Sequence, residues 1–189
     1  GTCGQGGKGS CSNCKSGTAA GDPIDALSGE VFTVPKTDLF LPGPFNLQID
    51  RSYSSFARSH DVGLGHGWTH TLAWRGEIRR DDILFHNGLG QTISFPRLAA
   101  AGDRSAVKGW GLMRTPHAYV LRAGDEFMHV FAPDPERKHL LQLRAISYRN
   151  LGTIELSYDR GRLSRVTDAA GRTVLFSHDG DGHIASISV

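Results

Sequence analysis

Residues Tyr158–Val189 read YDRGRLSRVTDAAGRTVLFSHDGDGHIASISV. The stretch is polar and punctuated by glycine, yet apolar residues return along it at short intervals. Aligned with the residues just before it and with itself, it repeats at an offset of 20 residues, and of 21 at one glycine turn. The matching pairs are Leu143 with Leu163, Ile146 with Val166, Thr153 with Thr173, Leu156 with Phe176, Tyr158 with His178, Asp159 with Asp179, and, at the longer offset, Gly161-Arg162-Leu163 with Gly182-His183-Ile184.

Each repeat unit reads as an aromatic residue and an aspartate, a glycine turn, a short strand of the form Leu-x-x-Val, a second glycine turn and another short strand. A lone strand pair of this kind is marginally stable, whereas units that pair edge to edge form a continuous antiparallel sheet. The aspartate suits a turn because its carboxylate accepts hydrogen bonds from nearby backbone N–H groups. A plain β-meander with coincidental echoes stays open. We predict repeat core at Tyr158, Leu163, Val166, Phe176 and Ile184, and turns at Asp159, Gly161, Gly171, Asp179 and Gly182.

The preceding residues also predict strands, because short apolar runs alternate there with glycine and proline. Asn87-Gly88 predicts a hairpin turn, since both residues tolerate positive φ. The best helix candidate lies around Arg97–Val107, although it contains Gly102. The predicted fold is therefore all-β and antiparallel. Its expected strands are Val31–Val34, Leu39–Leu41, Phe45–Ile49, Thr69–Ile78, Ile83–His86, Gln91–Phe95, Gly111–Thr115, Tyr119–Arg122, Phe127–Phe131 and His139–Ser147.

Composition and charge exclude several classes of protein. The chain has 189 residues and a formal net charge of +2, with acidic and basic residues interspersed. Nucleic-acid binding needs a clustered basic footprint, which the sequence does not show. No run of about 18 apolar residues predicts a membrane span. The N-terminal GTCGQGGKGS has no apolar core and is not a signal peptide.

Residues 1–21 are rich in glycine and serine, and we predict a flexible linker because they have almost nothing to bury. This segment holds every cysteine of the chain: Cys3, Cys11 and Cys14. The Cys11–Cys14 spacing suits two zinc ligands, but no second pair of ligands follows to complete a tetrahedral site. A disulfide with one free thiol is a further alternative. We predict no cofactor, with zinc at these cysteines as the lesser alternative.

No catalytic arrangement emerges from the sequence. His66 and His70 have the spacing of a helical zinc-protease motif, but the accompanying glutamate is missing and the surroundings predict a strand. On a strand, residues four apart lie about 13 Å from each other, too far to share one ion. Neither a G-x-S-x-G elbow nor a phosphate-binding P-loop occurs. We predict that the chain is not an enzyme.

Three motifs carry a resemblance to a known family: GDPIDALSGE at 21–30, LPGP at 41–44 and GLGHGW at 63–68. In this order, and followed by Tyr158-Asp159, Gly161-Arg162-Leu163 and the second turn around Gly171, they resemble the N-terminal pre-repeat region and first YD repeats of Rhs polymorphic toxins. The resemblance spans nearly the whole chain. It implies a linker at 1–21, a pre-repeat β domain at 22–138 that caps or plugs a shell, and the first YD repeats at 139–189. Leu64 and Trp68 are the expected plug residues.

The resemblance also implies a function. The complete protein would be a hollow β-shell, or cocoon, that encapsulates a C-terminal toxin for delivery to competing bacteria, by type VI secretion or a similar route. Expected partners are the rest of the shell, the toxin, a PAAR/VgrG secretion spike and a chaperone, with no nucleic acid. The expected location is bacterial: synthesis in the cytoplasm, then export without a visible signal peptide. The competing interpretation is a carbohydrate- or surface-binding domain with Trp74, Trp110 and Tyr119 as stacking platforms.

Overall fold

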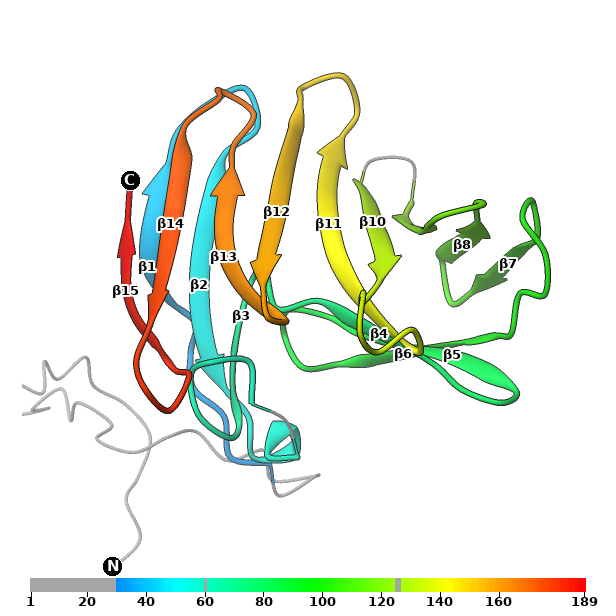
Figure 1. The fold of residues 1–189 in the computed structure, drawn as a ribbon, viewed down its shortest axis with the longest axis horizontal. Helices are drawn as coiled ribbons and strands as arrows, with labels where there is room; N and C mark the ends of the chain where they lie inside the picture. Colours follow the sequence, from blue (N-terminus) through cyan, green and yellow to red (C-terminus); the bar gives the residue numbers. More distant parts are fainter. Residues whose placement is uncertain (1–29, 60, 125–126) are drawn as a thin grey trace, which may run out of the picture.

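The computed structural model describes residues 30–59, 61–124 and 127–189 (Figure 1). These residues form antiparallel β-sheets and one 3-10 turn, η1 (Ser55–Ala57), without an α-helix, so the all-β prediction is confirmed. No helix among them is long and apolar enough to span a membrane. The predicted N-terminal linker lies outside the described residues.

The strands fall into a three-stranded and a twelve-stranded sheet. The small sheet has the order β1-β2-β3, and the large one runs from β15 back to β7, with β4, β5 and β6 joined to it at β11. The strands are β1 (Lys36–Leu41), β2 (Leu47–Tyr53), β3 (Trp68–His70), β4 (Arg75–Ile78), β5 (Asp82–His86), β6 (Thr92–Pro96), β7 (Arg104–Val107), β8 (Trp110–Arg114), β9 (Tyr119–Ala123), β10 (Phe127–Pro133), β11 (Leu140–Tyr148), β12 (Thr153–Asp159), β13 (Arg162–Thr167), β14 (Thr173–His178) and β15 (Ile184–Ser188).

Three expectations about secondary structure are wrong. The strand expected at Val31–Val34 is absent, and Phe32 forms only an isolated β-bridge with Ser54. The candidate helix around Arg97–Val107 is a turn followed by β7, because Gly102 adopts a positive φ of 97° and the Asp103 carboxylate accepts a hydrogen bond from the Ala100 N–H. The single strand expected from Thr69 to Ile78 is interrupted, because the Ala73 N–H bonds back to the His70 carbonyl and separates β3 from β4.

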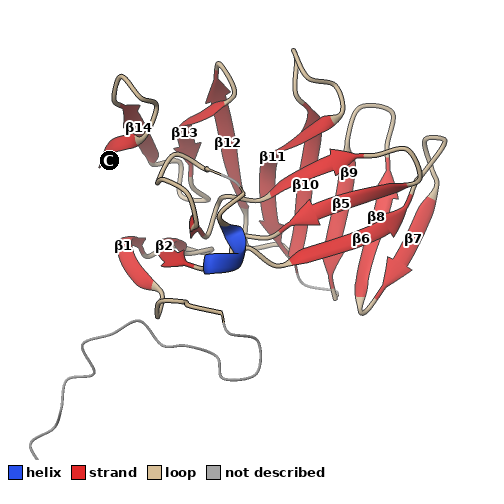
Figure 2. Cartoon of the chain, turned by 90° about the horizontal axis from the view of Figure 1, so that it is seen from below, coloured by secondary structure: helices blue, strands red, loops and turns tan. Residues whose placement is uncertain are grey.

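The large sheet branches at β11. One edge of β11 pairs with β10 along most of its length. Its other edge is shared, because β4 pairs with Leu140–Gln142 and β12 pairs with Ala145–Ser147. The branch sends β4–β6 in one direction and the repeat hairpins β12–β15 in another (Figures 1 and 2).

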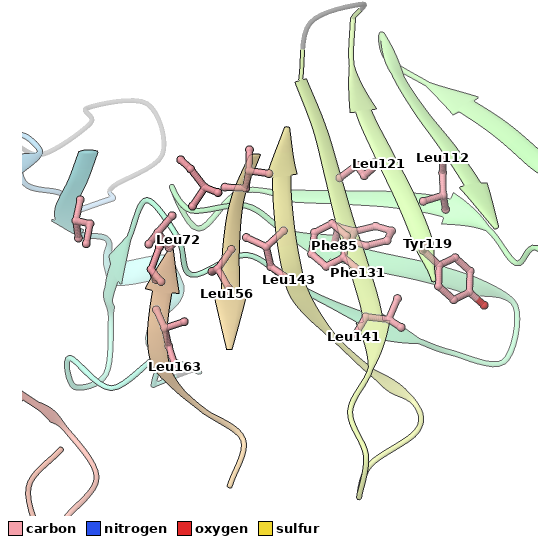
Figure 3. Packing of buried hydrophobic residues seen from close by; sticks show 14 of the residues in the cluster. Leu72, Phe85, Leu112, Tyr119, Leu121, Phe131, Leu141, Leu143, Leu156 and Leu163 are labelled. Atoms are coloured by element: carbon pink, nitrogen blue, oxygen red, sulfur yellow. The ribbon is translucent and has the colours of Figure 1, made fainter. Parts of the chain in front are cut away.

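Each branch is covered by a second layer. The Phe85 ring on β5 lies 4.8 Å from the Phe131 ring on β10, so β4–β6 cover one face of β8–β10 (Figure 3). The small sheet β1–β3 forms a separate layer beside β13 and β14 (Figure 2). Leu47 and Ile49 on β2 are fully buried in the same core as the repeat residues.

The Leu-x-x-Val motif of the repeat corresponds to a β-bulge. Side chains alternate between the faces of a regular strand, so residues three apart would point to opposite faces. In a bulge, two residues of one strand lie opposite one residue of its partner, so that residues three apart can face the same side of the sheet. It occurs three times: Arg144 is the extra residue between Leu143 and Ile146, Ser164 between Leu163 and Val166, and Ala185 between Ile184 and Ile187.

The repeat turns are of two kinds. Arg160 and Gly161 form a two-residue hairpin turn with positive φ at both residues, 47° and 78°. The three-residue turns 169–171 and 180–182 end at Gly171 and Gly182, each with positive φ. The longer offset in the sequence is therefore this change from a two-residue to a three-residue turn.

The Asn87-Gly88 hairpin between β5 and β6 also exists, but its geometry differs from the expectation. It has a three-residue loop, and the positive φ falls on Gly90 instead of Asn87 or Gly88. The Asn87 side-chain oxygen accepts hydrogen bonds from the N–H groups of Leu89 and Gln91. This is the same loop as the three-residue repeat turns.

Candidate functional site

The candidate site is a seam, where the two loops that carry the LPGP and GLGHGW motifs meet the two three-residue turns of the repeat. The first loop is at 42–43, between β1 and β2, and contacts the β13–β14 turn. The second is at 61–65, before β3, and contacts the β14–β15 turn. The two contacts lie at opposite ends of β14 (Figure 1).

The first half of the seam is built on Asp168. Its Oδ1 accepts hydrogen bonds from the backbone N–H groups of Ala170 and Arg172, and its Oδ2 accepts from Arg172 Nε at 2.7 Å. Burial alone would raise the pKa of Asp168, but the hydrogen bonds from Arg172 and Ala170 lower it below its ordinary value. Held in this way, Arg172 Nη2 donates to the Pro42 carbonyl at 2.6 Å.

The second half is built on two aspartates. Asp61 Oδ1 accepts from the N–H groups of Gly63 and Gly65, as Asp179 Oδ1 does from Asp181 and His183. The His183 ring lies between them, with Nε2 at 3.2 Å from Asp61 Oδ2 and Nδ1 at 3.8 Å from Asp179 Oδ2.

A backbone bond completes this half: the Ile184 N–H donates to the Gly63 carbonyl at 2.6 Å. Burial would raise the pKa of Asp61, but the two glycine N–H groups and His183 lower it. The seam therefore fixes the repeat turns to the earlier loops through charge-assisted and backbone hydrogen bonds. Its geometry positions chain segments relative to one another.

The predicted repeat-core residues lie as follows. Leu163, Val166 and Phe176 are buried, and Tyr158 and Ile184 are partly buried and pack against the core. Burial raises the pKa of the Tyr158 hydroxyl, and the Arg144 guanidinium lies 5.2 Å from its ring.

The two predicted turn aspartates differ. Asp179 accepts backbone hydrogen bonds as its turn requires. Asp159 lies exposed at the end of β12, beside a two-residue turn. Asp168, which is not among the predicted turn residues, has the bonding expected of Asp159.

The expected plug residues Leu64 and Trp68 are both partly buried. Trp68 packs edge-on against Tyr53, with the ring centroids 5.6 Å apart, and close to the Arg51 guanidinium. Gly67 comes so close to the Tyr53 ring that a Cβ atom there would clash with it. The role of Leu64 and Trp68 as a plug remains a prediction.

The two histidines of the GLGHGWTH segment lie in different surroundings. His66 is exposed and its Nδ1 lies 2.9 Å from the Arg58 carbonyl oxygen, whereas His70 is buried. Burial lowers the pKa of His70 to about 4. Within the described residues, no group of three histidine, cysteine or acidic side chains could hold a metal ion. Cys3, Cys11 and Cys14 lie outside the described residues, so zinc there stays an untested alternative.

The aromatic residues of the carbohydrate-binding alternative pack against one another and the core. Trp74 lies 5.7 Å from Trp110 and 4.2 Å from the His129 ring, between ring centroids. Tyr119 is buried, with 6% of its surface exposed. A stacking platform needs an exposed ring face, and this packing gives no support for that function.

The seam itself was missed by the sequence reasoning. Pro42 and Gly63 take part through backbone carbonyls, which leave no mark on the sequence. The available signal was the repeated pattern of Asp or Asn followed by glycine three residues later, at Asn87, Asp168 and Asp179. This pattern predicts a three-residue turn at Asp168 and not at Asp159, where the glycine follows two residues later.

Comparison with known proteins matches both parts of the chain. Residues 21–95 match the family described as Domain of unknown function (DUF6531), and residues 158–188 match the RHS Repeat. The chain is 30% identical over 177 residues to "Double-stranded DNA deaminase toxin A" of Burkholderia cenocepacia (strain H111). That alignment covers 88% of this chain and 11% of the toxin's own length. The resemblance expected from the sequence is confirmed.

Proposed function

We propose that this chain, an RHS repeat segment preceded by a DUF6531 domain and a distant homologue of a deaminase toxin, is a structural and non-catalytic part of an Rhs-type toxin shell. The seam is the observation that carries the proposal. It joins the DUF6531 loops to successive repeat turns through Arg172 with Pro42 and Ile184 with Gly63. A part held in this way would start and anchor a repeat array.

The arrangement of the repeats supports continuation of the array. Strand β15 pairs with β14, and within the described residues no strand pairs with its other edge. Unpaired N–H and C=O groups along a sheet edge are a template for another strand. A further unit of the same 20-residue length would pair there and cover the partly exposed Ile187.

The role of the whole protein is part of the proposal. The complete shell would enclose a C-terminal toxin, and this chain would form its N-terminal end, with residues 22–138 as cap and residues 139–189 as first repeats. Export from a bacterium through a secretion spike, with help from a chaperone, would deliver it. The similarity to a deaminase toxin supports only the class of protein and not a deaminase activity, because this chain aligns with only 11% of that toxin.

Limited proteolysis of the full-length protein that contains this chain tests the proposal. We expect its C-terminal region to resist a broad-specificity protease, and to lose protection in the double variant Arg172→Met/Asp61→Asn, which removes side-chain bonds from both halves of the seam. Arg165→Met, at an exposed position of β13, is the control and should keep the protection. A C-terminal region digested equally fast in the unmodified protein and the double variant would contradict the proposal.

A further inference from the structure

A cleft of about 400 Å³ lies between β4, β11 and the turns of the repeat hairpins. Leu72, Leu141 and Leu163 form part of its apolar lining (Figure 3). Its charged lining consists of three arginines and three aspartates, so its formal charges balance: Arg75, Arg137, Arg162, Asp61, Asp134 and Asp181. The seam forms one side of this cleft, but the cleft has a feature that the seam does not use.

That feature is the guanidinium of Arg75. The residue is partly buried on β4, and no hydrogen bond or ion pair links its side chain to any part of the chain that the structure describes. Burial lowers its pKa to about 10, an effect that Glu77 partly offsets. Taking a charge partly out of water without a hydrogen-bond partner costs free energy, and a bound acceptor would offset that cost.

The polar neighbours of Arg75 make their hydrogen bonds to other residues. Gln142, its partner across β11, donates to Asp134 and accepts from Arg144. Glu77, two residues along the same strand, is bonded to Arg79.

Two of the three aspartates that line the cleft, Asp134 and Asp61, also bind other residues. Asp134 binds Gln142 and lies 3.6 Å from Arg137, and Asp61 binds its own loop and His183. The Arg75 fork of N–H donors therefore lacks an acceptor supplied by the described chain.

A second donor group lines the same cleft. His70 is 4% exposed, and its Nδ1 has no hydrogen-bond partner among the described residues. Its lowered pKa keeps the ring neutral at pH 7, so the ring can donate one hydrogen bond without adding charge. Arg75 also lines a second cavity, of about 210 Å³, together with His86 and Asn87.

We propose that Arg75 is the anchor of a carboxylate-binding site in this cleft, with His70 beside it. A planar guanidinium binds a carboxylate through two parallel hydrogen bonds. One negative charge matches the single charge of the Arg75 guanidinium, whereas a phosphate would bring charge in excess. The apolar lining fits a carboxylate carried by a peptide segment better than one free in water.

Thermal unfolding of the 189-residue chain tests the site. Acetate, chloride and phosphate are compared at equal ionic strength, and then a short leucine-rich peptide with one glutamate and its glutamine twin. We expect acetate to raise the melting temperature above its value in chloride by about 2 °C or more, because a ligand that binds only the folded state stabilises it. The glutamate peptide should act at lower concentration than acetate, and the glutamine peptide should have no effect.

Two variants identify the residue. Arg75→Met should abolish the response to acetate and should melt no lower than the unmodified chain without ligand, because it removes a partly buried charge that has no hydrogen-bond partner in the described chain. Arg165→Met should respond like the unmodified chain. The Nε–Hε NMR signal of Arg75 should shift with acetate, a readout that does not depend on stability.

Several results would overturn the site: a response that survives in Arg75→Met, no response in the unmodified chain, an equal effect of the glutamine peptide, or a stronger effect of phosphate. Equal potency of acetate and the glutamate peptide would overturn the peptide as the source and leave a small free carboxylate.

Discussion

Arg172 and Pro42 are separated by 130 residues in the sequence and are joined by a hydrogen bond of 2.6 Å. The same guanidinium is held by Asp168, whose side chain is almost completely buried. One arginine therefore completes its own turn and binds that turn to a loop from the start of the chain. Asp168 orients the Arg172 guanidinium, and the guanidinium in this orientation donates to the Pro42 carbonyl.

Replacing Arg172 with methionine should destabilise the chain. The change leaves the buried Asp168 without its charged partner and the Pro42 carbonyl without its donor, and we expect a loss of roughly 2–3 kcal/mol in the free energy of unfolding. Urea denaturation measures the loss. Arg165→Met on the exposed face of β13 should change it by less than about 0.5 kcal/mol. Equal losses in the two variants would show that the seam contributes nothing.

The two glycines Gly171 and Gly180 form a matched pair for testing the turn geometry. Neither has an atom within 4 Å of a Cβ built on it, but Gly171 has a φ of 81° and Gly180 is not in the left-handed region. Gly171→Ala should cost about 1–2 kcal/mol through backbone strain alone. Gly180→Ala should be nearly neutral. Chemical denaturation of both variants gives the comparison, and similar costs would contradict the assigned backbone conformation.

Deletions should distinguish the bulged strand from a regular one. Removing Ser164 takes out the extra residue of the bulge and leaves Leu163 and the following valine two apart, so both still face the core. Removing Leu175 from β14 turns either Val174 or Phe176 to the opposite face.

We expect the second deletion to cost several kcal/mol, on the order of 3 to 5 for a lost buried phenylalanine, and the first to cost clearly less. Circular dichroism and denaturation midpoints measure both. If the Ser164 deletion unfolds the chain as readily as the Leu175 deletion, the bulge is not what sets the Leu-x-x-Val spacing.

Acid should destabilise the chain through its buried histidines. Burial lowers the pKa of His129 from its ordinary 6.5 to about 4. Between these values the unfolded chain binds the proton and the folded chain does not, so the free energy of unfolding falls as the pH falls from about 6.5 to about 4. The loss for one such group is about 3 kcal/mol at most.

His129→Phe keeps a ring against Trp74 and should flatten this part of the pH profile. His117→Phe, at an exposed position, should leave the profile unchanged. Urea denaturation at a series of pH values provides the curves, and identical slopes in all three proteins would rule out His129 as a contributor.

The sequence predicted the features that depend on local periodicity. The 20-residue unit, its longer turn and the all-β fold follow from apolar spacing and glycine positions, and the structure has each of them. The spacing of Leu163 and Val166 does not by itself predict a bulge, because a bulge is recognisable only when the opposite strand is known.

The seam and the cleft could not be predicted in this way. The Gly63 carbonyl and the Ile184 N–H are backbone groups that every such residue has, so their pairing depends on tertiary arrangement alone. The isolation of Arg75 is also a property of the assembled molecule, because it depends on Gln142 and Glu77 having other partners.

The three bulges fall on β11, β13 and β15, which is every second strand of the repeat. A bulge bends its strand and increases the local twist, so we expect each unit of about 20 residues to turn the sheet by a similar amount in the same sense. The curvature of the sheet would then increase by a fixed angle with each repeat unit. The total curvature of a longer array would then be determined by the number of its units.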